Sequence, residues 1–378
     1  MGRIKFLHFS DLHLGRPLSF IKKGNSFSFY SKFFDELVEL IQREGISFLV
    51  LAGDIFNSNY IEYRYRLLFK KFLKSINNCN VYYVAGNHDE YSEKFLSFLS
   101  SEKNFKVFEK NKISHYTDNG INIYGISFDF KKLGENPFST LSEDYFLSPA
   151  ICVLHCNLTD VVSDEHENYY PISIDRLTNF KANCYFALGH IHKYFLKSID
   201  NKVVSYPGSP IPVRSNEVGE RYVNIVEYDN GRFSVVKYPV GFRIEELEVK
   251  LEHSYSFSDI ESILIELESN NSYYIVKFCG EIDAGVYEDL LISKMDLIDN
   301  ISNIVDINMD NLIVKMDFER FSSPFLNIMK DEFAHLNLEI NPKLLKFIRK
   351  YGIDIDFERA KKNGFDILSS RIFRDDIK

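Results

Sequence analysis

Three short, nearly continuous apolar runs alternate with two amphipathic stretches in the first 90 residues, and this alternation constrains the fold more than any other feature. The runs are IKFLHFSD (4–11), ISFLVLAGD (46–54) and VYYVAGNHD (81–89), and the stretches 31–45 and 60–77 carry apolar residues at helical spacing. Runs that are apolar at successive positions are typical of strands covered on both faces. The order strand–helix–strand–helix–strand therefore predicts an α/β fold around a buried parallel sheet.

Between residues 105 and 240 the strand-like segments become shorter and more closely spaced. The tripeptide Asp229-Asn230-Gly231 separates two alternating runs, and Asn-Gly in that position is a strong hairpin signal. The segments predict a second sheet, mixed or antiparallel, that packs on the first; they are 120–128, 150–157, 184–191, 202–209 and 221–238.

The pattern changes again after Gly241. Strand-like runs around two helical segments, 258–268 and 285–299, predict a small α+β unit, and helical periodicity dominates the end of the chain. We therefore expect three parts, which are 1–242, 243–318 and 319–378.

Composition restricts the cellular setting. The 378 residues include 45% hydrophobic ones and carry a net charge of −9, so no general basic field favours nucleic acid, although a local basic strip or a bound metal can supply positive charge. Five cysteines without a C-x-x-C pair indicate reduced thiols inside a cell. The N-terminus has no secretory signal pattern, and no apolar run approaches the roughly 18 residues that span a bilayer. We expect a cytoplasmic protein that does not bind membranes.

Residue types that bind metals stand at the ends of five apolar runs. Because the carboxyl ends of parallel strands converge on one crevice, these side chains can meet although they are far apart in sequence. Asp11 with His13, and His190 with His192, are i,i+2 pairs whose side chains point the same way on an extended backbone. The candidate ligands are Asp11, His13, Asp54, Asn87, His155, His190 and His192.

The donor set indicates the kind of metal. Four imidazoles, two carboxylates and one amide oxygen, without a thiolate, suit divalent ions of intermediate hardness such as Mn²⁺ or Fe²⁺. Seven ligands are too many for one open catalytic site, whereas two ions about 3.5–4 Å apart that share a carboxylate use them all. Gly53, Gly86 and Gly189 allow tight turns and a close approach of the backbone to a ligand.

The same stretches resemble a known family. The motifs D-x-H, G-D, G-N-H-D, a lone H and G-H-x-H, in this order and each at a strand end, are those of the calcineurin-like metallophosphoesterases. Within that superfamily the chain is most similar to the SbcD-type DNA repair nucleases, including the YhaO-like branch, through FLHFSDLHLG, ALGHIHK (187–193) and YPGSP (206–210). The resemblance spans residues 3–240. It implies a four-layer αββα sandwich of two mixed β-sheets, followed by the α+β unit as a capping domain and by a helical tail.

The resemblance also implies roles for the ligands. One ion would be held by Asp11, His13 and His192, the other by Asn87, His155 and His190, with Asp54 bridging the two. Both ions are expected to be Mn²⁺, and Fe²⁺, Mg²⁺ and Zn²⁺ are alternatives.

Four further residues near these motifs have expected or open roles. By the resemblance His88 stabilises the transition state or protonates the leaving alkoxide. Asp89 either holds the His88 ring in its working tautomer or caps the next helix. Ser209 is either a turn residue or a residue that positions backbone near the metals. His8, inside the first strand, is expected to be a hydrogen-bonded core histidine.

The function that the resemblance implies is DNA phosphodiester hydrolysis by two metal ions, in the cytoplasm and associated with the nucleoid. The chain would be the exonuclease or endonuclease subunit of an SbcCD-like double-strand-break repair complex, acting on DNA ends, hairpins or single strands. Its partners would be a second copy of itself and an SbcC-type ABC ATPase with a coiled coil, docked by the helical tail; the capping domain would contact DNA. One alternative is a phosphatase or phosphodiesterase for nucleotides or other small molecules. Another is a scaffold subunit with a vestigial metal site. The residues that follow the catalytic domain argue against a small-molecule enzyme, which needs no such extension. The complete ligand set argues against a scaffold with a vestigial site.

Overall fold

The computed structural model describes residues 2–18, 26–129, 131, 134–161, 169–267 and 272–315. The chain divides into two compact units, Met1–Arg243 and Ile244–Lys378. The expected helical tail (319–378) lies outside the described residues.

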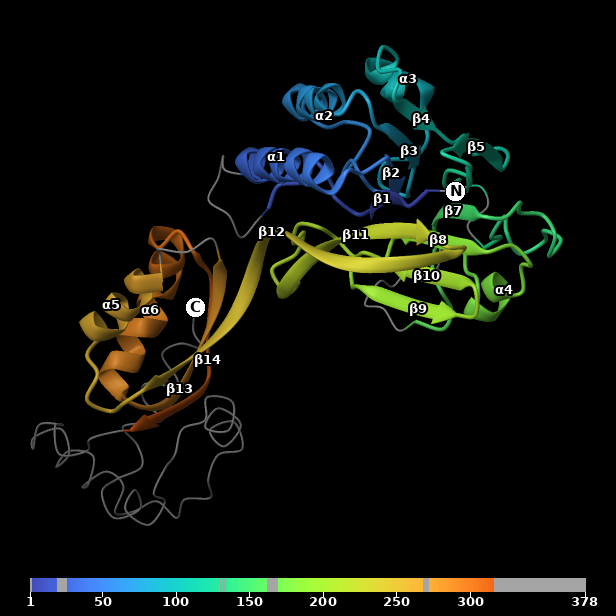
Figure 1. The fold of residues 1–378 in the computed structure, drawn as a ribbon. Coiled ribbons are helices and arrows are strands. Elements are labelled where there is room, and N and C mark those ends of the chain that lie inside the picture. The colour runs from blue at the N-terminus through green and yellow to red at the C-terminus, as the bar shows by residue number, and fades with distance from the viewer. Residues whose placement is uncertain are drawn as a thin grey trace, which may run out of the picture. The chain divides into compact units, whose positions relative to one another are not determined.

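The first sheet of the first unit has the predicted parallel core. Strand β1 pairs in parallel with β2, β2 with β3 and β3 with β4, while β11 lies antiparallel to β1 on the other side and β12 follows it. The sheet is therefore mixed (Figure 1). The bounds are β1 (Ile4–Phe9), β2 (Phe48–Ala52), β3 (Asn80–Val84), β4 (Phe105–Val107), β11 (Gly219–Asp229) and β12 (Arg232–Leu251).

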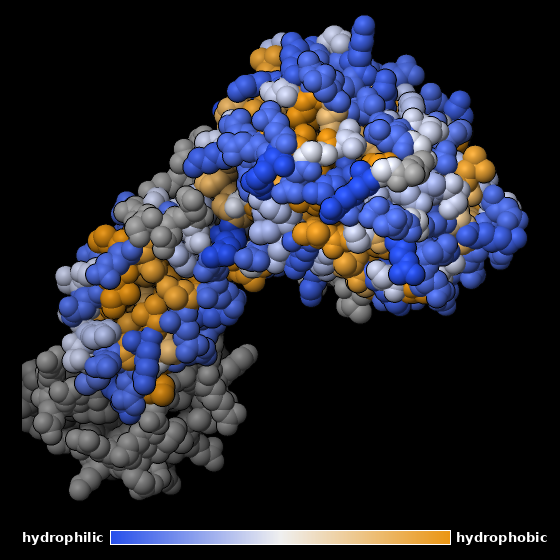
Figure 2. All heavy atoms as spheres, viewed as in Figure 1, coloured by the Kyte–Doolittle hydropathy of each residue, from blue (hydrophilic) through white to orange (hydrophobic). Residues whose placement is uncertain are grey.

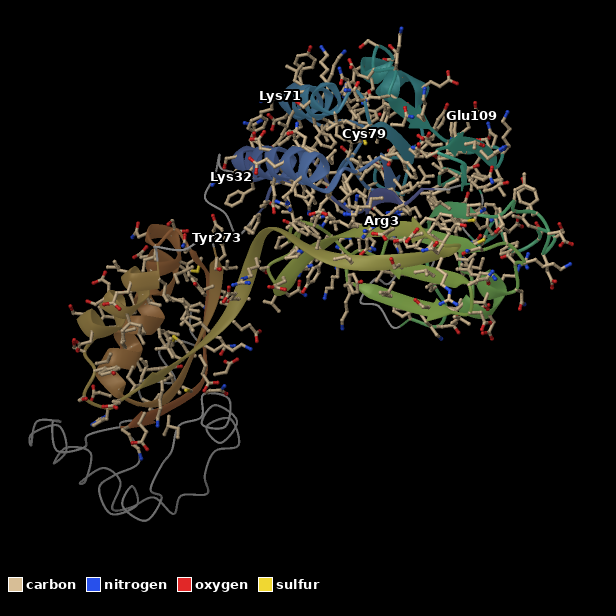
Figure 3. All side chains as sticks on the ribbon, in the orientation of Figure 1. Arg3, Lys32, Lys71, Cys79, Glu109 and Tyr273 are labelled. Atoms are coloured by element: carbon tan, nitrogen blue, oxygen red, sulfur yellow. The ribbon has the colours of Figure 1, made fainter. Side chains whose placement is uncertain are left out.

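Two helices connect these strands and cover the sheet. Helix α1 (Ser26–Glu44) begins five residues before the predicted start, and α2 (Tyr63–Ser75) lies within its predicted range. Phe33 of α1 packs on Phe9 of β1, and the apolar face of α2 is buried while Lys71 points outward (Figure 3). Two short helices, α3 (Glu93–Leu96) and the 3-10 helix η1 (Ser97–Leu99), follow β3.

The second sheet is mixed, in agreement with one of the two arrangements expected. Strands β6, β7, β8 and β10 run parallel, and β5 and β9 lie antiparallel at its two edges. The edge strands were not expected; half-exposed, polar sequences such as SHYTD give little periodic signal. The bounds are β5 (Ser114–Asp118), β6 (Ile121–Gly125), β7 (Ala150–His155), β8 (Cys184–Gly189), β9 (Phe195–Ile199) and β10 (Lys202–Tyr206).

The two sheets pack face to face through one apolar cluster. Phe6 and Val50 of the first sheet meet Ile151 and Tyr185 of the second within it. Loops and the single turn-length helix α4 (Ile174–Thr178) cover the outer face of the second sheet. Among the described residues, the fourth layer of the expected αββα sandwich therefore contains one short helix and is otherwise built from loops.

A polar network lies inside the layer between the sheets. His8 Nδ1 lies 2.8 Å from Tyr185 Oη, and Asn224 donates from Nδ2 to Tyr185 Oη (3.2 Å) and to Ser205 Oγ (2.9 Å). Burial lowers the pKa of His8 to about 3, so the ring is neutral. The prediction of a hydrogen-bonded core histidine is confirmed.

The predicted hairpin is also confirmed. Strands β11 and β12 are joined by Asn230 and Gly231, whose φ angles are +48° and +78°. Two successive positive φ values are those of the tight turn that matches the twist of an antiparallel pair.

The second unit differs from the expected α+β arrangement. Residues 244–251 of β12 pair in parallel with β13 (Tyr273–Asp283), and β13 pairs in parallel with β14 (Ile304–Lys315). Helices α5 (Phe257–Glu266) and α6 (Ala284–Asn300) are the connections, so this unit is α/β.

Apolar side chains remain on the surface of the second unit (orange in Figure 2). Leu291, Ile292 and Met295 of α6 are more than half exposed. Within the described ranges, no helix combines the length and the apolar character that a membrane span requires.

Candidate metal centre

The carboxyl ends of strands from both sheets meet at one site. Asp11 and His13 follow β1, Asp54 follows β2 and Asn87 follows β3, whereas His155 ends β7. His190 and His192 follow β8. The parallel arrangement brings together side chains that are up to 181 residues apart (from Asp11 to His192).

Asp11, His13 and His192 form one group. One ligand atom from each lies within 4.8 Å of the others. The Nε2 atoms of His13 and His192 are 3.2 Å apart, and backbone N–H of His190 donates to both carboxylate oxygens of Asp11 (3.0 and 3.1 Å). This is the set predicted for the first ion.

Asn87, His155 and His190 form a second group. His155 Nε2 lies 2.9 Å from Asn87 Oδ1, and the rings of His155 and His190 are 5.2 Å apart between centroids. His155 thus lies next to both other members of the set predicted for the second ion, and one of its ring nitrogens also lies within 4.8 Å of carboxylate oxygens of Asp11 and Asp54.

The carboxylate of Asp54 lies between the two groups. Its Oδ2 is 3.8 Å from His13 Nε2 and 3.5 Å from His155 Nε2, while its Oδ1 accepts the backbone N–H of His88 at 2.8 Å. One oxygen thus faces a member of each predicted ligand set, so Asp54 lies where a carboxylate shared by two ions would be expected.

Four of the seven candidate ligands have a strained backbone. The φ angles are +55° at Asp11, +47° at His13, +52° at Asp54 and +104° at His190. Residues other than glycine rarely adopt positive φ, and such strain concentrates where the surrounding fold imposes a functional geometry.

Glycines permit the close packing beneath the ligands. A Cβ atom at Gly53 would lie 2.3 Å from His155 Nδ1, one at Gly86 would lie 2.2 Å from Asp54 Oδ1, and one at Gly189 would lie 1.9 Å from the carbonyl oxygen of Ala52. The backbone thus comes close to the candidate ligands His155 and Asp54 at Gly53 and Gly86, as expected, whereas at Gly189 it comes close to the backbone of β2 instead.

Hydrogen bonds select the tautomers of two histidines. His155 Nδ1 lies 2.9 Å from the carbonyl oxygen of Ala52, and His192 Nδ1 lies 2.8 Å from Glu217 Oε1. An Nδ1–H that donates to such an oxygen leaves the Nε2 lone pair directed into the site, as in metal-binding histidines.

Burial dominates the electrostatics of the centre. It raises the pKa of Asp11 to about 6 and lowers the pKa of His13 well below its usual value. Burial alone would raise the pKa of Asp54 and lower that of His155, but their mutual attraction reverses both, so that the pKa of His155 rises to about 9. With this pKa the His155 ring carries a second proton at neutral pH. A cation bound between Asp54 and His155 would take the place of that proton.

The residues present fit two divalent cations. Asp11 and Asp54 are at most 2% exposed, and within the described ranges neither carboxylate forms an ion pair with a lysine or arginine. Two buried carboxylates surrounded by imidazoles need cationic compensation, and nitrogen and oxygen donors of this kind suit metals of intermediate hardness.

His88 lies on the open side of the centre. Its side chain is exposed, and its ring packs edge-on against His13 with 4.6 Å between centroids. The ring is therefore accessible to a substrate that reaches the ligands.

Asp89 is placed differently from both expectations. Its carboxylate is buried and accepts the backbone N–H groups of Gly86 (2.7 Å), Phe56 (3.0 Å) and Asp54 (3.1 Å). Because both oxygens are directed at these amides, Asp89 braces the loops after β2 and β3 and does not hold the His88 ring. The next helix, α3, is capped by Ser92 instead.

Glu217 is a site residue that the sequence did not indicate. It contacts His192 from 25 positions further along the chain, in a stretch without a recognisable motif. Ser209, whose role was open, donates its backbone N–H to the carbonyl oxygen of His192 (3.1 Å) and its hydroxyl to Glu217 Oε2 (3.1 Å).

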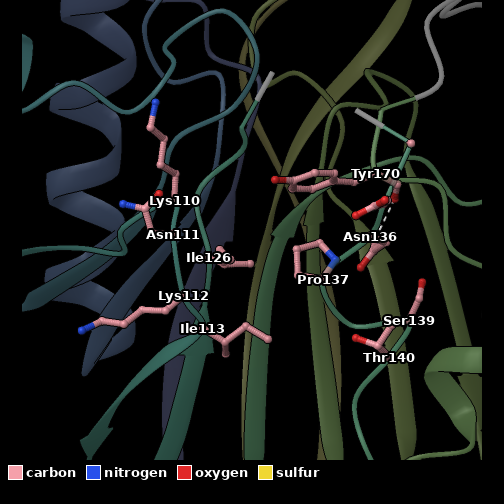
Figure 4. A pocket seen from close by; sticks show the side chains of 12 residues that line it. Lys110, Asn111, Lys112, Ile113, Ile126, Asn136, Pro137, Ser139, Thr140 and Tyr170 are labelled. Carbon is pink, nitrogen blue, oxygen red and sulfur yellow. Dashed lines mark hydrogen bonds between the residues drawn. The ribbon is translucent and has the colours of Figure 1, made fainter. Parts of the chain in front are cut away.

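A pocket of about 470 Å³ is lined by residues that follow β4 and β6 and by Tyr170. Lys110, which bonds Glu90 at 3.1 Å, and Lys112 stand on one side, and Tyr170 and Asn136 on the other (Figure 4). None of the nine predicted site residues lines this pocket, so it is separate from the metal centre.

Comparison with known proteins gives one family. The chain matches the calcineurin-like phosphoesterase family over residues 4–194. It is 29% identical over 255 residues to the uncharacterized metallophosphoesterase YhaO of Bacillus subtilis, a match that covers 61% of this chain and 59% of that protein.

Two further relatives have names that describe DNA repair or nuclease proteins. DNA double-strand break repair protein Mre11 of Sulfurisphaera tokodaii is 27% identical over 234 residues, covering 58% of this chain and 57% of that protein. The SbcD subunit of the nuclease SbcCD of Escherichia coli K12 is 26% identical over 310 residues, covering 70% of this chain and 74% of that protein. The chain thus spans less than two thirds of the length of the Bacillus subtilis YhaO and of the Sulfurisphaera tokodaii Mre11.

Proposed function

The chain belongs to the calcineurin-like phosphoesterase family, and from that premise we propose that it is a two-metal phosphodiesterase that hydrolyses DNA. The observation that carries the proposal is the position of Asp54, whose carboxylate lies within 4 Å of histidines from both ligand groups. A single carboxylate placed in this way supports a pair of ions better than a single ion.

The chain's own residues would divide the work of hydrolysis. Two bound cations would supply positive charge to the phosphoryl oxygens and acidify a water molecule. Asp11 and Asp54 are held by backbone amides, so their oxygens are oriented in advance. His88, exposed beside His13, would give a proton to the leaving oxygen.

DNA is proposed as the substrate because two relatives carry names that describe DNA repair or a nuclease. The name of the Escherichia coli relative also describes one subunit of a larger nuclease, so we propose an SbcC-type ATPase as a partner, and a second copy of this chain. The protein would act on DNA in the cytoplasm. The segment 319–378 proposed for docking the ATPase lies outside the described residues.

Hydrolysis assays with Mn²⁺ test the activity. We expect Mn²⁺-dependent cleavage of linear duplex DNA and of bis-p-nitrophenyl phosphate, lost on chelation and in Asp54→Asn. A protein inert toward both substrates, with fewer than two ions bound per chain, would establish a scaffold. Cleavage of cyclic nucleotides but not of DNA ends would establish a small-molecule phosphodiesterase instead.

The proposed assembly has a separate test. The mass of the purified chain in solution would reveal the dimer, and co-purification with a coiled-coil ATPase from the same cells would reveal the partner. A monomer that captures no ATPase, yet cleaves DNA, would leave the catalytic proposal standing and remove the assembly.

A further inference from the structure

We propose that Glu217 is a positioning residue that orients His192 toward the metal centre, and that Ser209 and Arg221 hold Glu217 in place. This inference rests on the proposed two-metal site. It assigns a role to a carboxylate that belongs to none of the recognised motifs.

The contact between Glu217 and His192 determines which nitrogen of the imidazole faces the site. Glu217 Oε1 lies 2.8 Å from His192 Nδ1, and the two side chains are 11% and 12% exposed. Because Nδ1–H donates to this carboxylate, Nε2 carries the lone pair and is directed at His13. Removing the carboxylate would remove the acceptor that selects this tautomer.

The second oxygen of Glu217 fixes the carboxylate itself. Oε2 accepts the backbone N–H of Val213 at 2.9 Å and the hydroxyl of Ser209 at 3.1 Å. Two donors on one oxygen, with His192 on the other, leave the plane of the carboxylate little freedom. The backbone at Val213 and the side chain of Ser209 therefore hold the carboxylate, and the carboxylate in turn holds the His192 ring.

Arg221 of β11 closes the arrangement from the other side. Its Nη1 donates to Ser209 Oγ at 3.3 Å and lies 3.8 Å from Glu217 Oε2, and its Nη2 donates to the carbonyl oxygens of Val218 (3.2 Å) and Glu217. The guanidinium is largely buried, which strengthens its attraction to the carboxylate. The loop between β10 and β11 thus contacts both Arg221 of the sheet and the candidate ligand His192.

The role is asymmetric between the two ions. His192 belongs to the group with Asp11 and His13, whereas His155 of the other group is oriented by the carbonyl oxygen of Ala52. Removing Glu217 should therefore weaken one metal position and spare the other. A residue that only closed its loop would affect both positions together, through loss of the fold.

The experiment measures Mn²⁺ binding to the full chain by calorimetry, together with the melting temperature in EDTA. In Glu217→Gln one amide oxygen cannot serve both His192 and Val213, and Glu217→Ala removes the contact altogether. We expect both variants to bind one Mn²⁺ as the unchanged chain does and the other about 10- to 100-fold more weakly, with the larger loss in the alanine variant. The melting temperature in EDTA should fall slightly in Glu217→Gln, because one largely buried donor loses its acceptor, but the weakening should be confined to one Mn²⁺ position.

Glu220→Gln is the matched control. Glu220 lies three residues further along, is about half exposed and pairs with Arg243 at 3.2 Å, so its loss should leave both Mn²⁺ affinities unchanged. Unchanged affinities in both Glu217 variants would overturn the inference, as would an equal weakening of both positions with a lower melting temperature in EDTA. If the unchanged chain binds no divalent ion, the proposed function itself fails.

Discussion

The carboxylate of Asp89 lies beneath Asp54 and accepts its backbone N–H at 3.1 Å, while it also accepts the N–H of Gly86 at 2.7 Å. The loops that follow two neighbouring strands are thus joined by one buried side chain. The positions of Asp54 and Asn87 relative to each other depend on this brace, which makes Asp89 structural although it lies next to the accessible His88.

Replacing Asp89 should therefore affect stability more directly than chemistry. In Asp89→Asn the side-chain NH₂ group replaces one of the two oxygens, so at least one of the three backbone N–H groups loses its acceptor. The free energy of unfolding should therefore fall by about 1–3 kcal/mol. Urea unfolding in EDTA would measure the change. Stability equal to that of the unchanged chain would show that the three amide contacts are not needed.

Replacing His88 should have the opposite effect. The side chain is exposed, packs edge-on against His13 and belongs to neither predicted ligand set, so His88→Gln should keep the stability and both metal ions. Loss of a proton donor to the leaving group should lower turnover by about 10²- to 10⁴-fold. Metal analysis and steady-state hydrolysis of bis-p-nitrophenyl phosphate test this, and loss of both ions in the variant would contradict the assigned role.

Metal binding should stabilise the first unit. A ligand at 100 times its dissociation constant that binds the folded chain alone adds about 2.7 kcal/mol to the free energy of unfolding. The urea midpoint should rise on addition of Mn²⁺ and return on chelation, and the rise should be much smaller in Asp54→Asn. A midpoint that does not respond to Mn²⁺ in the unchanged chain would argue against the site.

The close approach at Gly189 predicts a sharp effect of a single methyl group. In Gly189→Ala the new Cβ would meet the carbonyl oxygen of Ala52 at 1.9 Å, so β8 must move away from β2, and His190 and His192 with it. We expect a loss of about 1–3 kcal/mol in stability and a loss of metal affinity. Gly134→Ala is the control, because its Cβ would have no neighbour within 4 Å.

The cysteines should differ in reactivity toward a thiol reagent. Burial raises the pKa values of Cys79 and Cys156 to about 12 and that of Cys152 well above its usual value, and Cys184 is buried as well. Cys279 is partly exposed. We expect one reactive thiol in the native chain and five in denaturant, with none reactive in native Cys279→Ser; a second fast thiol in the native chain would contradict the packing.

Local sequence patterns were sufficient for much of the fold. Continuous apolar runs identified β1, β2 and β3 because strands buried on both faces have no polar side. Asn230-Gly231 identified its hairpin because few residue pairs accept two positive φ values in succession. The seven candidate ligands at strand ends could likewise be recognised, since parallel strands bring their carboxyl ends together whatever the connections between them.

Only the tertiary structure showed which groups are contacted by the carboxylates that lie near those ligands. Asp89 and Glu217 are both carboxylates near a histidine, yet Asp89 is directed at backbone amides and Glu217 at His192. The direction of a side chain depends on the φ and ψ angles of its residue and on which loops lie opposite. The strained backbone at Asp11 and Asp54 shows that contacts between distant segments, and not local preference, set those angles.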